Sequence, residues 1–94
     1  MPIFKGNITQ FIAQNMRYPA AAFSKGVQGR VVVTFCVEPD CSVTDPKVVI
    51  GVDKDLDAEA LRLIQLTSGQ WTPAMDNGKA VRCKYNMPVT FRLS

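Results

Sequence analysis

The 94-residue sequence contains no histidine and only three cysteines, Cys36, Cys41 and Cys83. Without histidine, a catalytic nucleophile would need lysine or a carboxylate as its base, and zinc would have only three thiols as ligands. The sequence also has no glycine-rich loop of the kind that holds phosphates. We therefore expect that the protein is not an enzyme, and that it uses no metal ion, cofactor or small-molecule substrate.

Long apolar runs are also missing. The longest, 31–33 and 48–50, are far shorter than the roughly 20 residues of a membrane helix, and the N-terminus lacks the apolar core of a signal peptide. These absences favour a cytosolic protein, or a soluble part of a longer protein whose targeting segment lies upstream. The net charge of +3 is too small for the dense basic surface of a nucleic-acid-binding protein, so we expect no such partner.

The residues that are present have the periodicity of one small domain, with a hydrophobic content of 47%. Helical spacing of apolar residues marks the helices, with Asn7 and Asp53 as N-terminal caps and Gly26 as a C-terminal stop, and alternation of apolar and polar residues marks the strands. The alternation slips within the second strand, which predicts a bulge near Thr44 and Asp45. The predicted elements are helices over 8–16, 19–25 and 56–67 and strands over 30–37, 42–50 and 80–93.

Proline positions predict the order of these strands in the sheet. Proline cannot donate a hydrogen bond within a sheet, so it is found mainly in edge strands. Pro46 and Pro88 lie in the second and third strands, whereas the strand over 30–37 has no proline and belongs in the middle. We predict a two-layer α+β fold with a three-stranded antiparallel or mixed sheet of order 2-1-3 and with the helices on one face. The helix over 56–67 then forms a right-handed crossover between the outer strands.

The last strand is therefore expected to lie at an edge of the sheet. Its odd-numbered residues face the core, and its even-numbered residues face solvent. The predicted solvent-facing set is Arg82, Lys84, Asn86, Thr90 and Arg92. Charges and a proline on an edge either protect it from aggregation or leave it free to pair with an extended ligand. The residues alone leave both possibilities open.

Several other residues have competing interpretations. For Trp71 we expect a core position rather than a ligand-stacking role, and for Tyr18 we expect packing against the sheet edge. The carboxylates at 53, 55, 57 and 59 stand at a helix start without the spacing of a calcium loop, so helix capping is the better interpretation. We expect three free thiols with Cys83 buried, the alternative being a disulfide between Cys36 and Cys41 across the hairpin.

Six short motifs, in this order, resemble the C-terminal domain of TonB-like energy-transducing proteins. The motifs are Tyr18-Pro19, Gly26 with Gly29, Pro39-Asp40, Leu56-Asp57, Trp71-Thr72-Pro73-Ala74 and Pro88-Val89-Thr90-Phe91-Arg92-Leu93. The resemblance covers roughly residues 8–94, and we assign the whole chain, 1–94, to one such domain. One departure is Cys41, because the family typically has glycine there, where the turn requires a positive φ.

The resemblance implies a periplasmic domain that is tethered to the inner membrane and powered there by a proton-driven complex. It also implies that the domain captures the TonB box, a short extended segment of an outer-membrane transporter, as an added strand along its last strand. The segment before Tyr18-Pro19 lies near the box in relatives. The resulting candidate peptide-binding residues are Asn15, Met16, Arg17, Arg82, Lys84, Tyr85, Asn86, Met87, Val89, Thr90 and Arg92.

Two other functions remain open. One, within the resemblance, is the same module appended to a membrane-anchored sensor or peptidase, where it would serve in partner recognition or signalling. The other is a structural or homodimerisation domain, which would use the free strand edge to pair with its own copy.

Overall fold

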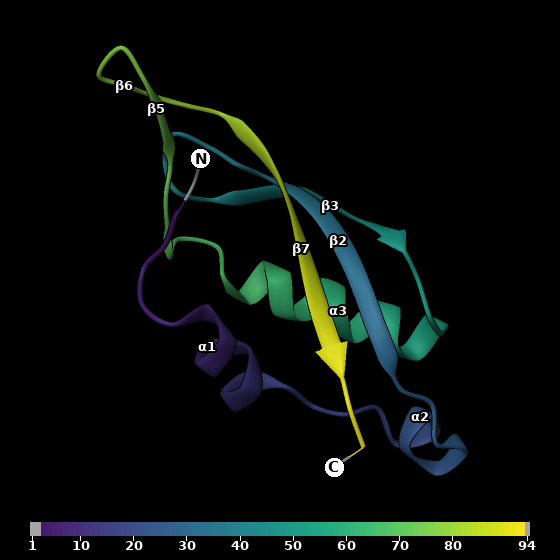
Figure 1. Ribbon diagram of the computed structural model, residues 1–94. Helices are drawn as coiled ribbons and strands as arrows, with labels where there is room; N and C mark the ends of the chain where they lie inside the picture. Colours follow the sequence, from purple (N-terminus) through teal and green to yellow (C-terminus); the bar gives the residue numbers. More distant parts are fainter. Residues whose placement is uncertain (1–2, 94) are drawn as a thin grey trace.

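A three-stranded antiparallel sheet with helices on one face forms the centre of the computed structural model, which describes residues 3–93 (Figure 1). Residues 1, 2 and 94 of the predicted domain lie outside this range. Strand β2 (Gly29–Val37) lies between β3 (Val43–Ile50) and β7 (Cys83–Phe91). The predicted α+β class, the 2-1-3 order and the edge position of the last long strand are therefore confirmed.

The core lies between β2 and helix α3 (Lys54–Leu66), which follows β3 in the chain. On β2 the alternate residues Val31, Val33, Phe35 and Val37 are fully buried. The apolar face of α3 covers them with Leu56, Ala60, Leu63 and Ile64. Since burying one such side chain contributes about 1.5–3 kcal/mol, this layer of contacts fixes which face of the sheet is covered.

Helix ends follow the predicted caps. The Asn7 side chain accepts a hydrogen bond from the Gln10 amide at the start of α1 (Ile8–Asn15). Asp53 accepts one from the Asp55 amide at the start of α3. Helix α2 (Ala20–Lys25) ends at Gly26, whose φ of 67° is left-handed and favours glycine. No helix within residues 3–93 is both long and apolar enough to cross a membrane.

Strand β3 contains the predicted bulge. Thr34 pairs with Lys47 and Cys36 with Thr44, so β3 has one extra residue between these pairs. Asp45 adopts a φ of 52° there. The bulge bends this edge strand and directs the Asp45 carboxylate to Arg82, 2.8 Å away.

The prediction of one continuous last strand over 80–93 is wrong. Residues before Arg82 form a separate hairpin of β5 (Ala74–Asp76) and β6 (Lys79–Val81). Asn77 and Gly78 both have positive φ, as a two-residue hairpin turn requires. Because β2 ends at Val37, which pairs with Cys83, β2 offers no partner to residues before Cys83, and β6 pairs with β5 instead.

Trp71 lies in the core, as predicted, with 2% of its surface exposed. Its ring centroid is 5.3 Å from that of Phe4 and 5.5 Å from that of Phe35, and its indole N–H donates to the Thr67 hydroxyl. It stands in a short strand, β4 (Trp71–Thr72), that pairs with β1 (Ile3–Phe4), and neither strand was predicted from the sequence. Two-residue strands have no detectable periodicity.

Tyr18 packs against the edge strand of the sheet, which confirms its predicted place. Its ring meets Phe91 of β7 edge to face at 5.9 Å, and its hydroxyl donates to the Val27 carbonyl oxygen.

The cysteines are all free thiols in the structure, but the expected burial of Cys83 is wrong. Cys83 is half-buried because it begins an edge strand, whereas Cys36 is buried because it has neighbouring strands on both sides. Cys41 adopts a φ of 75°, the left-handed conformation that the glycine of the family suggested.

Replacing Cys41 with glycine should raise the free energy of unfolding by about 1 kcal/mol, because it relieves the left-handed strain of a residue with a Cβ atom. Denaturant unfolding measures this change. The matched control is Cys83→Gly, which lies in a strand with negative φ and should destabilise the protein. Stabilisation by both replacements, or by neither, would contradict the strain at Cys41.

Candidate functional site

A groove of about 680 Å³ runs between helix α1 and the free edge of β7. Apolar side chains from both elements line most of it, with Arg92 at one end. The lining residues are Thr9, Ile12, Ala13, Met16, Tyr85, Met87, Pro88, Val89, Thr90 and Arg92. Six of the predicted peptide-binding residues belong to this groove.

The edge of β7 adds unpaired main-chain groups to this groove. Among residues 3–93, β7 pairs with β2 on one side and has no strand on the other. In an antiparallel pair, one residue directs both its N–H and its C=O group toward the partner strand, and the next residue directs both groups away from it. An edge proline normally lies where its N–H would point away, so Pro88 indicates that the N–H groups of Lys84 and Asn86 face the free side. A free strand edge beside an apolar groove fits an extended peptide that binds by strand addition.

The groove's helical wall is fixed by a charge pair on α3. Glu59, only 7% exposed, accepts hydrogen bonds from Arg62 at 2.7 Å and from the backbone N–H of Arg17 at 2.7 Å. Arg62 donates in turn to the carbonyl oxygen of Asn15 at 2.8 Å. The pair therefore holds the backbone on both sides of Met16, whose side chain lines the groove. We call these two residues the Glu59–Arg62 clamp.

The clamp determines the charge of Glu59. Burial by itself raises the pKa of this carboxyl, but the hydrogen bonds from Arg62 and from the Arg17 amide outweigh it and hold the pKa below its ordinary value. The pKa of Arg62 is raised by its hydrogen bond to Glu59.

The expectation that Glu59 caps the helix is wrong, because its side chain points to the segment before Tyr18 instead of to the start of α3. Asp53 and Asp57 do bond to backbone N–H groups at that start.

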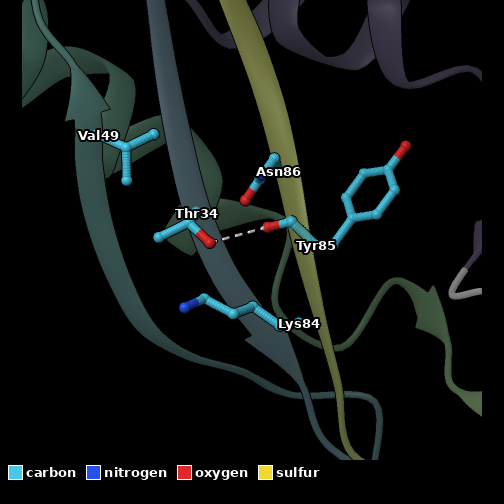
Figure 2. Close-up of a pocket in the computed structure, with 5 residues that line it drawn as sticks. All are labelled: Thr34, Val49, Lys84, Tyr85 and Asn86. Atoms are coloured by element: carbon cyan, nitrogen blue, oxygen red, sulfur yellow. Dashed lines mark hydrogen bonds between the residues drawn. The ribbon is translucent and has the colours of Figure 1, made fainter.

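The remaining candidate residues do not line the groove. Asn15 and Arg17 contact the clamp through their backbone, and Arg82 forms ion pairs with Glu38 at 2.7 Å and Asp45 at 2.8 Å. Lys84 and Asn86 line a different hollow, of about 630 Å³, on the sheet face that carries no helix. Figure 2 shows both side chains on the β2 side of β7, with the Tyr85 ring pointing to the opposite side. The structure thus separates the predicted set into a groove group and an open-face group.

Four groove residues were missing from the sequence prediction, namely Thr9, Ile12, Ala13 and Pro88. The three on α1 lie beside β7 because α1 packs on the core through Ile12 and because the clamp holds the chain after α1 against α3, over sequence separations of 42 and 47 residues. No local pattern indicates such a contact. Within the described part of the chain, no group of three or more His, Cys, Asp or Glu side chains is placed to hold a metal ion.

Comparisons with known proteins agree on one family. A family model described as the C-terminal region of the Gram-negative bacterial TonB protein matches residues 14–93. No curated protein sequence matches the chain significantly.

Solved structures of TonB C-terminal domains are similar to this fold. A solution structure from Helicobacter pylori, residues 179–285, is 30% identical, with a TM-score of 0.74 over 93% of this chain and 78% of that one. A shorter form of that domain, residues 194–285, is also 30% identical, with a TM-score of 0.61 over 87% of each chain. The Pseudomonas aeruginosa domain shares the fold at 22% identity, with a TM-score of 0.63 over 99% of this chain and 85% of that one.

Replacing Glu59 with glutamine should lower the free energy of unfolding by about 1–3 kcal/mol at neutral pH, because the partly buried hydrogen bonds that Glu59 accepts from Arg62 and from the Arg17 amide are weakened. The folded-state pKa of Glu59 is lowered, so its stabilisation is present above the pKa of the unfolded chain and is lost as pH falls through the folded pKa. When the pH is lowered from neutral to below about 4.3, the free energy of unfolding of the Glu59→Gln variant should therefore fall by less than that of the parent chain. Denaturant unfolding across a pH series measures both effects.

The control is Glu38→Gln, since the pKa of Glu38 is also lowered, by hydrogen bonds from Thr44 and Arg82, but its side chain lies away from the groove. Amide chemical shifts of Met16 should change in the Glu59 variant and stay constant in the Glu38 variant. Unchanged Met16 shifts in both variants would contradict the clamp.

Proposed function

The chain belongs to the family of TonB C-terminal domains of Gram-negative bacteria, and we propose that it captures the TonB box of an outer-membrane transporter by β-strand addition. The family consists of non-enzymatic, transport-associated domains that are periplasmic and interact with outer-membrane transporters. In the proposal, the captured segment lies along β7, in the groove beside α1. The complete protein is tethered to the inner membrane, where a proton-driven complex supplies the energy.

The observation that supports this proposal is the free edge of β7 beside an apolar groove. A strand added at this edge gains main-chain hydrogen bonds, which depend little on the ligand's sequence. Its alternate side chains face either the groove or the open side of the sheet. One such site can therefore serve several transporters that share an extended segment but differ in side chains.

The geometry also suits a link that bears force. In a strand pair that is pulled along its length, several hydrogen bonds share the load, whereas peeling from one end breaks them one at a time. The two walls of the groove are held by different means. β7 pairs with β2 over nine residues, and the clamp attaches the end of α1 to α3. A captured peptide would then contact two elements that are both anchored to the core.

Replacing Lys84 with proline should weaken binding of a box peptide about tenfold, because it removes one outward N–H group and disturbs the pairing geometry. The fold should stay intact, since this N–H does not bond to β2. Titration of a fluorescently labelled box peptide measures the affinity, and amide spectra report the fold. Lys84→Ala is the matched control, because it removes the same side chain and keeps the N–H. Equal affinity of the proline and alanine variants would contradict strand addition at this position.

Replacing Ala13 with tryptophan should also weaken the box peptide, by tenfold or more, because the indole fills the groove from its α1 wall. Gln14→Trp is the control, since Gln14 is exposed on the same helix and does not line the groove. A loss of affinity at both positions, or at neither, would contradict binding within the groove.

Analytical ultracentrifugation tests the homodimer as an alternative: a dimer that no box peptide dissociates would oppose the capture of a transporter segment.

A further inference from the structure

The sheet face opposite the helices has a trough that strand addition does not use. Two hollows, of about 630 and 340 Å³, lie side by side on this face and share Thr34 and Lys84. The strand register explains their arrangement. Thr34 of β2 pairs with Lys47 of β3 and Asn86 of β7, and in the next row Cys36 pairs with Lys84. The trough therefore runs along the middle strand between the two outer strands.

Small side chains form the floor of the trough, and long side chains stand at its two sides. Thr34 and Cys36 have small side chains and are only 5% and 7% exposed. Lys47 and Lys84 rise from the outer strands on either side, and Figure 2 shows the Lys84 side chain reaching from β7 across β2. The outer strands are about 10 Å apart, twice the usual strand spacing. This width admits one extended chain.

The positive charge of the trough that has no acidic partner comes from two lysines, Lys47 and Lys84, because Arg82 is already paired. Arg82 lies at one end, where Glu38 and Asp45 hold its guanidinium at 2.7 and 2.8 Å. Within residues 3–93, neither Lys47 nor Lys84 has a carboxylate within ion-pair distance. The two lysines flank the floor from opposite strands, so carboxylates at alternate positions of an extended chain can meet both of them.

We propose that this trough is a second binding surface, and that it takes an extended, acidic segment of a protein partner. The segment lies along β2 over Thr34 and Cys36, with its carboxylates beside Lys47 and Lys84. The exposed side chain of Val49 supplies an apolar contact at the rim. This surface is distinct from the α1–β7 groove and does not depend on capture of the TonB box.

The test uses a short capped peptide that alternates glutamate and serine, titrated at low ionic strength and followed by amide chemical shifts. Binding should move the amides of Thr34 and Lys47 and leave those of Thr9 and Ile12 in place, and added salt should weaken it. The double variant Lys47→Gln/Lys84→Gln should bind about tenfold more weakly. Lys5→Gln/Lys25→Gln is the matched control, because it removes the same charge at exposed positions outside the trough and should bind like the parent chain.

Three results would overturn the proposal. One is an equal loss of affinity in the two double variants, which would indicate a response to net charge alone. Another is a shift pattern centred on Thr9 and Ile12, which would place the acidic peptide in the groove. The third is binding to phosphatidylglycerol vesicles with no binding of the peptide, which would indicate a membrane partner. A shift pattern on the trough supports the proposal even if box-peptide capture at β7 fails, so the two functions are tested separately.

Discussion

The packing of the odd-numbered face of β2 against α3 is the interaction on which the other features depend. A three-stranded sheet has two faces and two edges, and the helices of a chain this small cover only one face. Val31, Val33, Phe35 and Val37 are fully buried on that face. The opposite face and the edge of β7 consequently stay accessible, and both surfaces that we propose for binding lie there.

The accessible edge becomes a specific site only where a second element stands beside it. Helix α1 has one buried residue, Ile12, and its Ile8 and Phe11 side chains pack partly buried against the core. Its position also depends on the Glu59–Arg62 clamp, which bonds to the backbone at Asn15 and Arg17. Glu59 is buried whereas Arg62 is 36% exposed, so the pair adds modest net stability, but removing Arg62 would leave the buried carboxylate without its charged partner. Such a pair sets a position strictly, which is what the wall of a groove requires.

Much of the fold could be predicted from local patterns. The alternation in β2, the Asn7 and Asp53 caps and the slip at Thr44 each depend on neighbouring residues, and the structure confirms them. Pro46 and Pro88 gave the strand order because a missing N–H restricts a strand wherever it lies. The errors arose where the partner was distant. The β5–β6 hairpin exists because β2 ends at Val37, and Cys36 is more buried than Cys83 because it has strands on both sides.

The same distinction applies to the candidate site. The sequence by itself determined that β7 is a proline-containing edge and that its even-numbered side chains avoid the core, since alternation and a missing donor are properties of the strand alone. Only the tertiary structure decided that Met16 and α1 face this edge, that Arg82 is already paired, and that Lys84 belongs with Lys47 across the sheet. These relations join residues far apart in the chain, and their energies arise from burial and charge pairing that exist only after the layers have packed.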